Sequence, residues 1–247
     1  MGLKVITLSD LRVLFLDVDG TLTVDRYSYD LHLGAVEALR RAVRAGVTVS
    51  LVSSNALPIV VGLSRYIGLN GPAIGESGGL VYHDEWGLVD LGDKPGFEPY
   101  RAVLREFSDC VEDSWQNRFR FYDLALKVKR TCRSRERSVF EDVKRFVESY
   151  FPGFTAEYSG YAIHIHSVSV SKRRAVLYVL ERLSVKPEEA GGVGDSLVDA
   201  SFLSVLGYSA AVSNADEELK TTVRFNLSSP SGLGVVEFIE RVLSGLL

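Results

Sequence analysis

The stretch Phe15-Leu16-Asp17-Val18-Asp19-Gly20-Thr21 ends an apolar run that begins at Val13 and is typical of a buried strand. It places two carboxylates, two residues apart, directly after that strand and before a Gly-Thr turn. Ligands of open α/β sheets collect beyond the carboxyl ends of the strands, so these acids would stand where chemistry is usually done. The alternative is a solvated turn, because Asp-Gly is a common turn signal.

The composition is that of an ordinary globular protein. The chain has 247 residues, of which 46% are hydrophobic and 24% charged, enough for a substantial core in one or two domains. With 28 basic and 32 acidic residues the net charge is -4, which gives no electrostatic reason to expect a nucleic acid or an anionic membrane as partner. A small anionic substrate would therefore need a locally positive pocket.

The cysteines and the N-terminus bear on the compartment. Cys110 and Cys132 are too few for a disulfide scaffold, and no Cys/His spacing resembles a zinc site. The segment from Met1 to Asp10 lacks the long apolar run of a signal peptide, and no other run reaches transmembrane length. We therefore expect a cytoplasmic protein in a reducing compartment, with no membrane partner.

Strand and helix patterns alternate at both ends of the chain. The first part predicts helices over 33–45 and 57–67 and strands over 47–52 and 73–75. The last part predicts helices over 172–183, 197–203, 215–221 and 235–243 and strands over 190–193 and 208–212. Such alternation is typical of a parallel sheet covered by helices.

The pattern changes near His83, where Gly, Asp and Pro dominate as far as Pro99. Beyond it we predict helices over 97–107 and 134–150, a strand or hairpin over 119–128, and a hairpin of strands 154–158 and 161–167. The sequence therefore predicts an α/β protein: a doubly wound, Rossmann-like parallel-sheet core over 1–82 and 168–247, with an inserted α+β domain over 83–167.

Further polar positions fall at strand ends of the divided core. Ser53 closes the second strand, Lys172 opens the helix after the insertion, and Asp195 and Asp199 follow another apolar strand in Gly194-Asp195-Ser196-Leu197-Val198-Asp199. Each is by itself more often a turn residue, a surface charge or a helix cap. In this order, and with the two acids of the opening stretch, they form a complete set of parts for phosphoryl transfer.

Phosphoryl transfer requires positioned charge more than covalent chemistry. Asp17 would attack phosphorus and form an aspartyl phosphate, while Asp19 would protonate the leaving oxygen and then activate water. Clustered carboxylates suit Mg2+, which would screen the repulsion between nucleophile and phosphate. Asp17 and Asp195, with Asp199 as a further candidate, would hold the metal, and the phosphate would contact Lys172, Ser53, Ser54 and the turn of Gly20 and Thr21.

These motifs resemble the four motifs of the haloacid dehalogenase superfamily of Mg2+-dependent phosphatases. The resemblance implies that the first Asp of the opening stretch, Asp17, is the nucleophile and that Asp19 is the acid/base. It also implies that Asp17, the backbone carbonyl of Asp19, and Asp195 share the metal.

A more extensive similarity, to archaeal-type phosphoglycolate phosphatases, covers nearly the whole chain. It rests on Ser53-Ser54-Asn55, Gly71-Pro72, the run from Gly75 to Gly79, Asn117-Arg118 and Ser159-Gly160-Tyr161. It implies that the insertion is a cap that closes over the site and that 2-phosphoglycolate is the leading substrate. Val198 and Ser77 depart from the family pattern, which commonly has Asn at both positions. The first departure leaves Asp199 without its usual polar neighbour.

Side chains of the insertion offer candidates for substrate contact. Arg118 and Arg120 alternate with two Phe residues, so both could face the cleft and bind a substrate carboxylate, although a solvated surface would explain them equally well. We hypothesise that Arg118 contributes to substrate choice. His164 and His166 share one face of a predicted strand, where substrate contact or packing is favoured over metal binding because no third ligand is evident.

Two alternatives to a phosphoglycolate phosphatase remain open. Within the family, a sugar-phosphate or mannosyl-3-phosphoglycerate phosphatase would accept a larger leaving group. Outside it, a receiver module that is phosphorylated on Asp also uses an acidic pocket, a Ser or Thr, a Lys and Mg2+. The second acid of the opening stretch and the long insertion disfavour the receiver. The exposed insertion could also support a homodimer.

Overall fold

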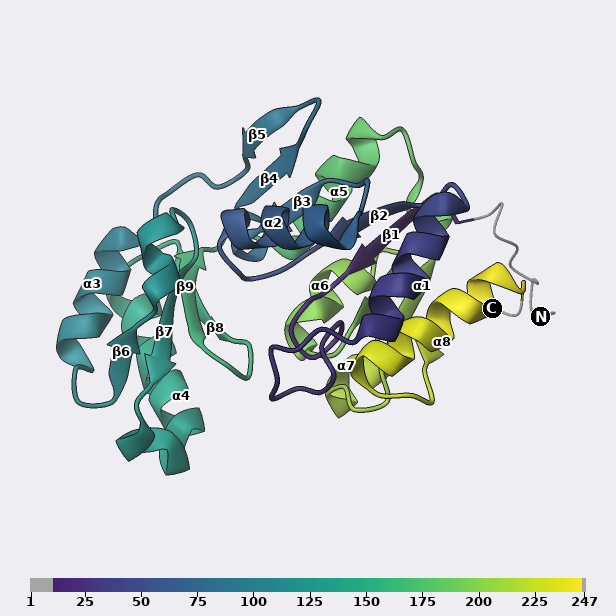
Figure 1. Ribbon diagram of the computed structural model, residues 1–247. Coiled ribbons are helices and arrows are strands. Elements are labelled where there is room, and N and C mark those ends of the chain that lie inside the picture. Colours follow the sequence, from purple (N-terminus) through teal and green to yellow (C-terminus); the bar gives the residue numbers. More distant parts are fainter. Residues whose placement is uncertain (1–10, 246–247) are drawn as a thin grey trace.

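The strand of the opening stretch, β1 (Val13–Leu16), is an inner strand of a five-stranded parallel sheet in the computed structural model, which describes residues 11–245 (Figure 1). The strand order is β12-β11-β10-β1-β2. The other strands are β2 (Thr48–Leu51), β10 (Ala190–Gly194), β11 (Tyr208–Ala211) and β12 (Phe225–Asn226). Our expectation for the segment from Met1 to Asp10 lies outside the described residues.

The order of the strands reverses between β1 and β10. From β1 the chain runs through α1 (Leu33–Arg44) to β2 on one side. On the other side of β1 lies β10, which leads through α6 (Ala200–Leu203) to β11. A crevice forms at such a switch point, beyond the carboxyl ends of the two strands.

Helices cover both faces of the sheet (Figure 1). On one face α1 packs beside α8 (Ser231–Leu243), and on the other α5 (Lys172–Arg182) packs against α6. The remaining helices of this part are α2 (Leu57–Ile67) and α7 (Glu217–Lys220). The predicted doubly wound α/β core is confirmed, and its observed helices begin and end close to the predicted bounds, except that α8 begins four residues before the predicted Val235.

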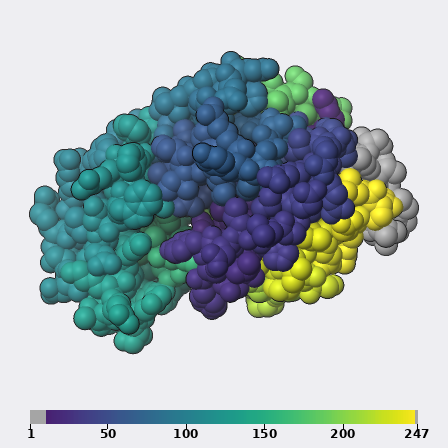
Figure 2. All heavy atoms as spheres, in the orientation of Figure 1, coloured from purple at the N-terminus to yellow at the C-terminus, as the bar shows by residue number. Residues whose placement is uncertain are grey.

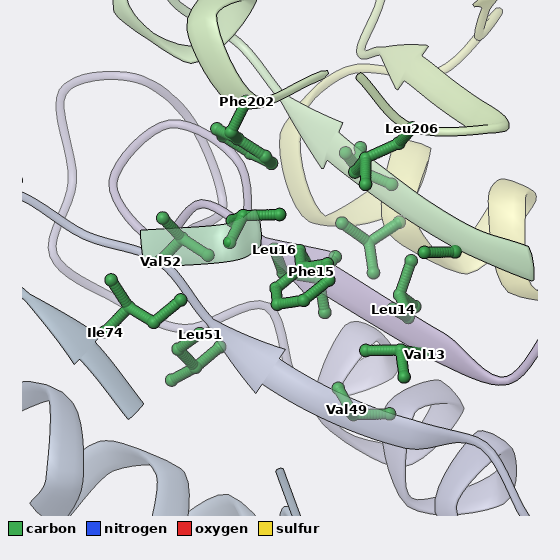
Figure 3. Packing of buried hydrophobic residues seen from close by; sticks show 14 of the residues in the cluster. Val13, Leu14, Phe15, Leu16, Val49, Leu51, Val52, Ile74, Phe202 and Leu206 are labelled. Atoms are coloured by element: carbon green, nitrogen blue, oxygen red, sulfur yellow. The ribbon is translucent and has the colours of Figure 1, made fainter. Parts of the chain in front are cut away.

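The apolar run of the opening stretch forms the centre of the hydrophobic core. Phe15 is fully buried, with Leu51 and Ile74 to one side of it and Phe202 and Leu206 to the other (Figure 3). Burying a side chain of this size stabilises a fold by about 1.5–3 kcal/mol. The strand that carries the two acids is therefore among the most firmly held parts of the chain.

A small antiparallel sheet extends the core beyond the predicted boundary. β3 (Ala73–Gly75) touches the main sheet through a bridge between Val52 and Ile74 and pairs with the hairpin of β4 (Leu80–His83) and β5 (Gly87–Asp90). We did not predict this hairpin. Leu91 packs in the core cluster of buried residues, whereas Tyr100 packs in a second cluster. We therefore propose that the inserted domain begins between Leu91 and Tyr100 rather than at residue 83.

The inserted domain is a four-stranded antiparallel sheet with two helices. Its strand order is β6-β7-β9-β8, and its own cluster of buried residues, the cap cluster, includes Val143, Val147 and Leu124. The elements are α3 (Phe97–Glu106), β6 (Val111–Asp113), β7 (Leu124–Val128), α4 (Glu136–Tyr150), β8 (Phe154–Tyr158) and β9 (Ile163–Ser167). This is the α+β module that the sequence predicts.

Our prediction of a strand or hairpin over 119–128 is wrong in its first half. The structure has a 3-10 helix, η3 (Trp115–Phe119), followed by a bend, and only β7 is extended. The side chain of Asn117 accepts from the N–H of Ala125 and donates to its carbonyl, so it takes the place of a neighbouring strand. The remaining 3-10 segments are η2 (Glu76–Gly78), η4 (Arg130–Arg135), η5 (Pro187–Glu189) and η6 (Leu197–Asp199).

Cys110 and Cys132 form a disulfide within the inserted domain. Our prediction of a reducing compartment rested on the small number of cysteines, and the disulfide removes that support. Disulfides also form in intracellular proteins of hyperthermophilic archaea. The cysteines therefore do not identify the compartment.

Candidate active site

The acids of the opening stretch meet the later acidic pair at the switch point of the sheet. Asp17 follows β1 and Asp195 follows β10, and β1 and β10 are paired in parallel. One carboxylate oxygen from each of Asp17, Asp195 and Asp199 lies within 4.8 Å of the others, and all three residues are buried. Such a set of oxygens suits a small divalent cation.

The ammonium group of Lys172 partly balances this negative charge. Its Nζ lies 2.8 Å from Asp17 Oδ1 and 2.7 Å from Asp199 Oδ1. Burial raises the pKa of Asp17, and the nearby carboxylate of Asp199 raises it further. Burial and Asp199 also raise the pKa of Asp195 to about 7. Burial opposes the charge of Lys172, but the two carboxylates raise its pKa. Lys172, together with Arg26 beside Asp195, gives two cationic side chains for three acids, so the ionised cluster would keep a negative charge that a metal ion could neutralise.

Asp195 and Asp199 differ in the partners that their carboxylate oxygens have within the protein. Asp199 Oδ2 accepts from the backbone N–H groups of Asp195 and Ser196, each at 3.2 Å. Asp195 Oδ2 is buried and forms an ion pair with Arg26 Nε at 2.7 Å. The guanidinium of Arg26 would therefore have to move from Asp195 Oδ2 for a metal to bind there, whereas Asp199 holds its own loop and Lys172. That Asp195 is a firmer metal ligand than Asp199, as the sequence suggests, stays a prediction.

Gly20 allows the turn to approach Asp195. Its φ is +88°, and a Cβ atom there would lie 2.3 Å from Asp195 Oδ2, so both the backbone and the space require glycine. The N–H of Gly20 donates to Thr23 Oγ1 at 2.9 Å, and the hydroxyl of Thr21 donates to Asp195 Oδ1 at 3.3 Å. The N–H of Thr21 donates to the carbonyl of Val18 at 3.3 Å. These groups already have partners within the protein, and the predicted contact with phosphate would have to replace those bonds.

Asp19 lies beside the acidic cluster and has different partners. Asn55 Nδ2 donates to Asp19 Oδ2 at 2.6 Å and to Ser53 Oγ at 3.0 Å. Burial raises the pKa of Asp19, while the hydrogen bond from Asn55 opposes the rise. A carboxyl group with a raised pKa suits proton transfer near neutral pH. The carboxylate of Asp19 is not part of the three-acid group, and metal binding through its carbonyl stays a prediction.

The acids line a cavity of about 100 Å³ between the core and the inserted domain. Its core side includes Asp17, Asp19, Ser53, Ser54, Asn55, Lys172, Asp195 and Asp199, and its other side includes Ser114, Gln116, Arg120, Lys127, Ser159, Tyr161 and His164. The loop after β1, purple in Figure 2, also touches the inserted domain, where the hydroxyl of Tyr161 donates to the carbonyl of Arg26. The inserted domain therefore forms one wall of the site.

Arg118 and Arg120 have different positions, so each of the two explanations that the sequence left open holds for one of them. Arg120 is 3% exposed and lines the cavity, whereas Arg118 is exposed and does not line it. The cause is η3, since a 3-10 helix has three residues per turn and does not place alternate residues on one side. Lys127 also lines the cavity and, within residues 11–245, has no carboxylate partner.

Several contacts around His164 were not predicted. Its Nδ1 lies 2.9 Å from Asp123 Oδ1, and Asp123 is fully buried. Although burial opposes ionisation, His164 and then Arg120 hold the pKa of Asp123 well below its usual range. His166 pairs instead with Glu157, whose carboxylate raises the pKa of His166 to about 9 against the effect of burial. One histidine thus lines the cavity and the other packs, and neither belongs to a metal-binding group in the part that the structure describes.

Sequence and structure comparisons agree on one family. Residues 112–239 match the family model described as haloacid dehalogenase-like hydrolase. A Staphylothermus marinus protein named phosphoglycolate phosphatase is 42% identical over 233 residues, which cover 94% of this chain and 98% of that protein. A Metallosphaera sedula protein of the same name is 37% identical over 236 residues, with 95% and 100% covered.

Solved structures show the same architecture. A Thermoplasma acidophilum protein aligns with a TM-score of 0.79 at 27% identity, covering 94% of this chain and 98% of that one. A haloacid dehalogenase-like hydrolase from Bacteroides thetaiotaomicron aligns with a TM-score of 0.76 at 18% identity, covering 94% and 99%. No helix within residues 11–245 has the length and apolar character needed to cross a membrane.

Proposed function

Because the chain belongs to the haloacid dehalogenase-like hydrolases and is a phosphatase, we propose that it hydrolyses 2-phosphoglycolate through an aspartyl phosphate, with Mg2+ as cofactor. The observation that carries the proposal is the cluster of Asp17, Asp195 and Asp199 around Lys172 at the switch point of the sheet. The inserted domain is then the cap of the enzyme, and we use that name below.

Each side chain of the cluster has a proposed role. Asp17 attacks phosphorus, and Lys172 keeps that carboxylate in place and faces the phosphate oxygens with positive charge. Asp19 gives a proton to the leaving oxygen and later takes one from water. Asp17 and Asp195, with Asp199 as a further candidate ligand, would hold Mg2+. When bound, Mg2+ would neutralise the acids and polarise the phosphate.

The cavity favours a small acidic leaving group. Its volume of about 100 Å³ suits a glycolate better than the sugar-bearing leaving group of a mannosyl-3-phosphoglycerate. Arg120 and Lys127 bring positive charge to the cap side, opposite the acids, where a substrate carboxylate would lie. These two residues take the place of Arg118 in our proposal for substrate choice.

Phosphate release from a panel of esters tests this proposal. The purified protein is incubated with Mg2+ and, in turn, 2-phosphoglycolate, glycerol phosphate, mannosyl-3-phosphoglycerate and p-nitrophenyl phosphate. We expect the highest kcat/KM for 2-phosphoglycolate, no release in the presence of a chelator, and no release from Asp17→Asn. A preference for the sugar ester would favour the alternative substrate. Release that is undiminished in Asp17→Asn would falsify the mechanism, and the membership in the hydrolase family already excludes the receiver module.

A further inference from the structure

The side chain of Gln116 connects the cap to Asp19. Gln116 lies in η3 of the cap, and its Nε2 donates to Asn55 Oδ1 at 2.8 Å. Asn55 belongs to the core loop after β2, and its Nδ2 donates in turn to Asp19 Oδ2 at 2.6 Å. Two amide side chains thus link the cap to the residue that we propose for proton transfer.

The direction of each hydrogen bond in this chain is fixed from the cap end. Gln116 Oε1 accepts from the backbone N–H of Ala56 at 2.9 Å and from Arg120 Nη2 at 3.0 Å. Both partners can only donate, so they hold the oxygen of Gln116 toward themselves and leave its NH2 group for Asn55.

The same argument applies to the next amide. Asn55 Oδ1 accepts from Gln116, so its NH2 group must face Asp19 Oδ2 and Ser53 Oγ. If Asn55 were flipped, its oxygen would face the carboxylate of Asp19, and two acceptors would oppose each other. Gln116 therefore determines which end of Asn55 reaches Asp19.

The cap segment that carries this chain is docked on the core next to it. Glu76 Oε2 accepts from the backbone N–H groups of Phe121, Tyr122 and Asp123 at 2.8, 2.7 and 3.3 Å. Glu76 adopts a φ of +51°, a conformation that non-glycine residues rarely take and that the surrounding contacts must hold. Docking of the cap and completion of the amide chain thus involve one short stretch, Gln116 to Asp123.

We propose that Gln116 and Asn55 are positioning residues, which hold the carboxyl group of Asp19 for proton transfer to the leaving oxygen only while the cap is docked. The inference rests on the proposed function. It adds that cap closure, besides enclosing the substrate, completes the general acid. The step moves one proton from Asp19 to the oxygen of the breaking P–O bond, whose electron pair that oxygen keeps.

Two substitutions separate this role from a structural one. Gln116→Met removes every hydrogen bond of the side chain. Gln116→Glu keeps an acceptor for Ala56 and Arg120 but has no donor for Asn55, so the cap contact survives and the connection to Asp19 is lost. Tyr122→Phe is the matched control, because it removes a cap–core hydrogen bond to Asp90 that does not involve Asp19.

The readout compares two leaving groups. The alkoxide of 2-phosphoglycolate needs a proton to leave, whereas p-nitrophenolate does not, and kcat/KM reports the steps up to P–O cleavage. General acid catalysis contributes roughly 10²–10⁴-fold. We expect both Gln116 variants to lose about tenfold or more in kcat/KM for 2-phosphoglycolate, with a much smaller loss for p-nitrophenyl phosphate and no change in Tyr122→Phe.

The possible outcomes are distinct. Equal losses for the two esters in folded Gln116 variants, or no loss for either, would overturn the inference. A loss in Gln116→Met that is absent in Gln116→Glu would also overturn it, because the acceptor alone would then suffice. Failure of the unsubstituted enzyme to hydrolyse either ester would refute the proposed function instead. Thermal unfolding of each variant identifies any that is misfolded.

Discussion

The buried carboxyl of Asp195 should make the metal-free protein less stable as the pH rises. In the unfolded chain the pKa of this group lies near the ordinary aspartate value of 3.8, and in the folded protein burial and Asp199 raise its pKa to about 7. Between these values the folded state binds one more proton than the unfolded state, so the free energy of unfolding falls as pH increases. A difference of about three pH units corresponds to about 4 kcal/mol.

Asp195→Asn is the perturbation that isolates this effect. Asn cannot ionise, so the variant should lose the part of the decline between pH 4 and 7 that Asp195 contributes, while Asp17 and Asp19, whose pKa values are also raised, keep theirs. The variant should therefore exceed the unsubstituted protein in stability at pH 7.5 without metal. Added Mg2+ should stabilise the unsubstituted protein, because binding to the folded state alone shifts the equilibrium, and should have little effect on the variant.

The assay is denaturant unfolding with a chelator at several pH values from 4.5 to 7.5. The acid part of this range also titrates other carboxyl groups, so the difference between the two proteins is the measured quantity. A difference that does not change with pH, or a variant less stable than the unsubstituted protein at pH 7.5, would refute the reasoning.

Three other predictions follow from the site and the cap. Asp17→Asn should abolish the acid-stable labelling of the enzyme by a radioactive phosphate ester. Asp19→Asn should leave the Mg2+ affinity, measured by calorimetry, largely unchanged; an equal loss of Mg2+ affinity in both variants would contradict their separate roles. Lys127→Met should raise KM for 2-phosphoglycolate by about tenfold but not for glycerol phosphate, and Arg118→Met, its exposed control, should change neither. Cys110→Ser, which opens the disulfide, should lower the free energy of unfolding by about 3 kcal/mol, measured without reductant; an unchanged midpoint would show that the crosslink does not constrain the unfolded chain.

The sequence predicted which acids come together at the edge of the sheet, because these residues follow buried strands directly. Asp17 and Asp195 are each placed by an apolar run whose pairing is easy to recognise, and parallel strands end at the same edge. The order of the motifs then indicated which acids would meet. Lys172 was identified from its place at the start of the helix that follows the insertion.

The cap half was harder to predict because its contacts depend on irregular backbone. The alternating pattern allowed Arg118 to face the cleft or the solvent, and a 3-10 helix next to Asn117's contacts with Ala125 leaves it at the surface. Gln116 carries no sequence signal, since its role depends on a core loop 60 residues away along the chain. The hairpin of β4 and β5 was missed because one of its strands is only half-buried and its polar residues resemble a loop.

The core cluster and the cap cluster are separate sets of buried residues, and this separation affects how the enzyme can vary. Stability changes at distant, independent sites add, whereas those in one packed cluster interact. Substitutions around Val143 and Val147 in the cap should therefore combine freely with substitutions around Phe15 in the core. If the cap selects the substrate, as we propose, substitutions there can change substrate preference without changing the stability of the core.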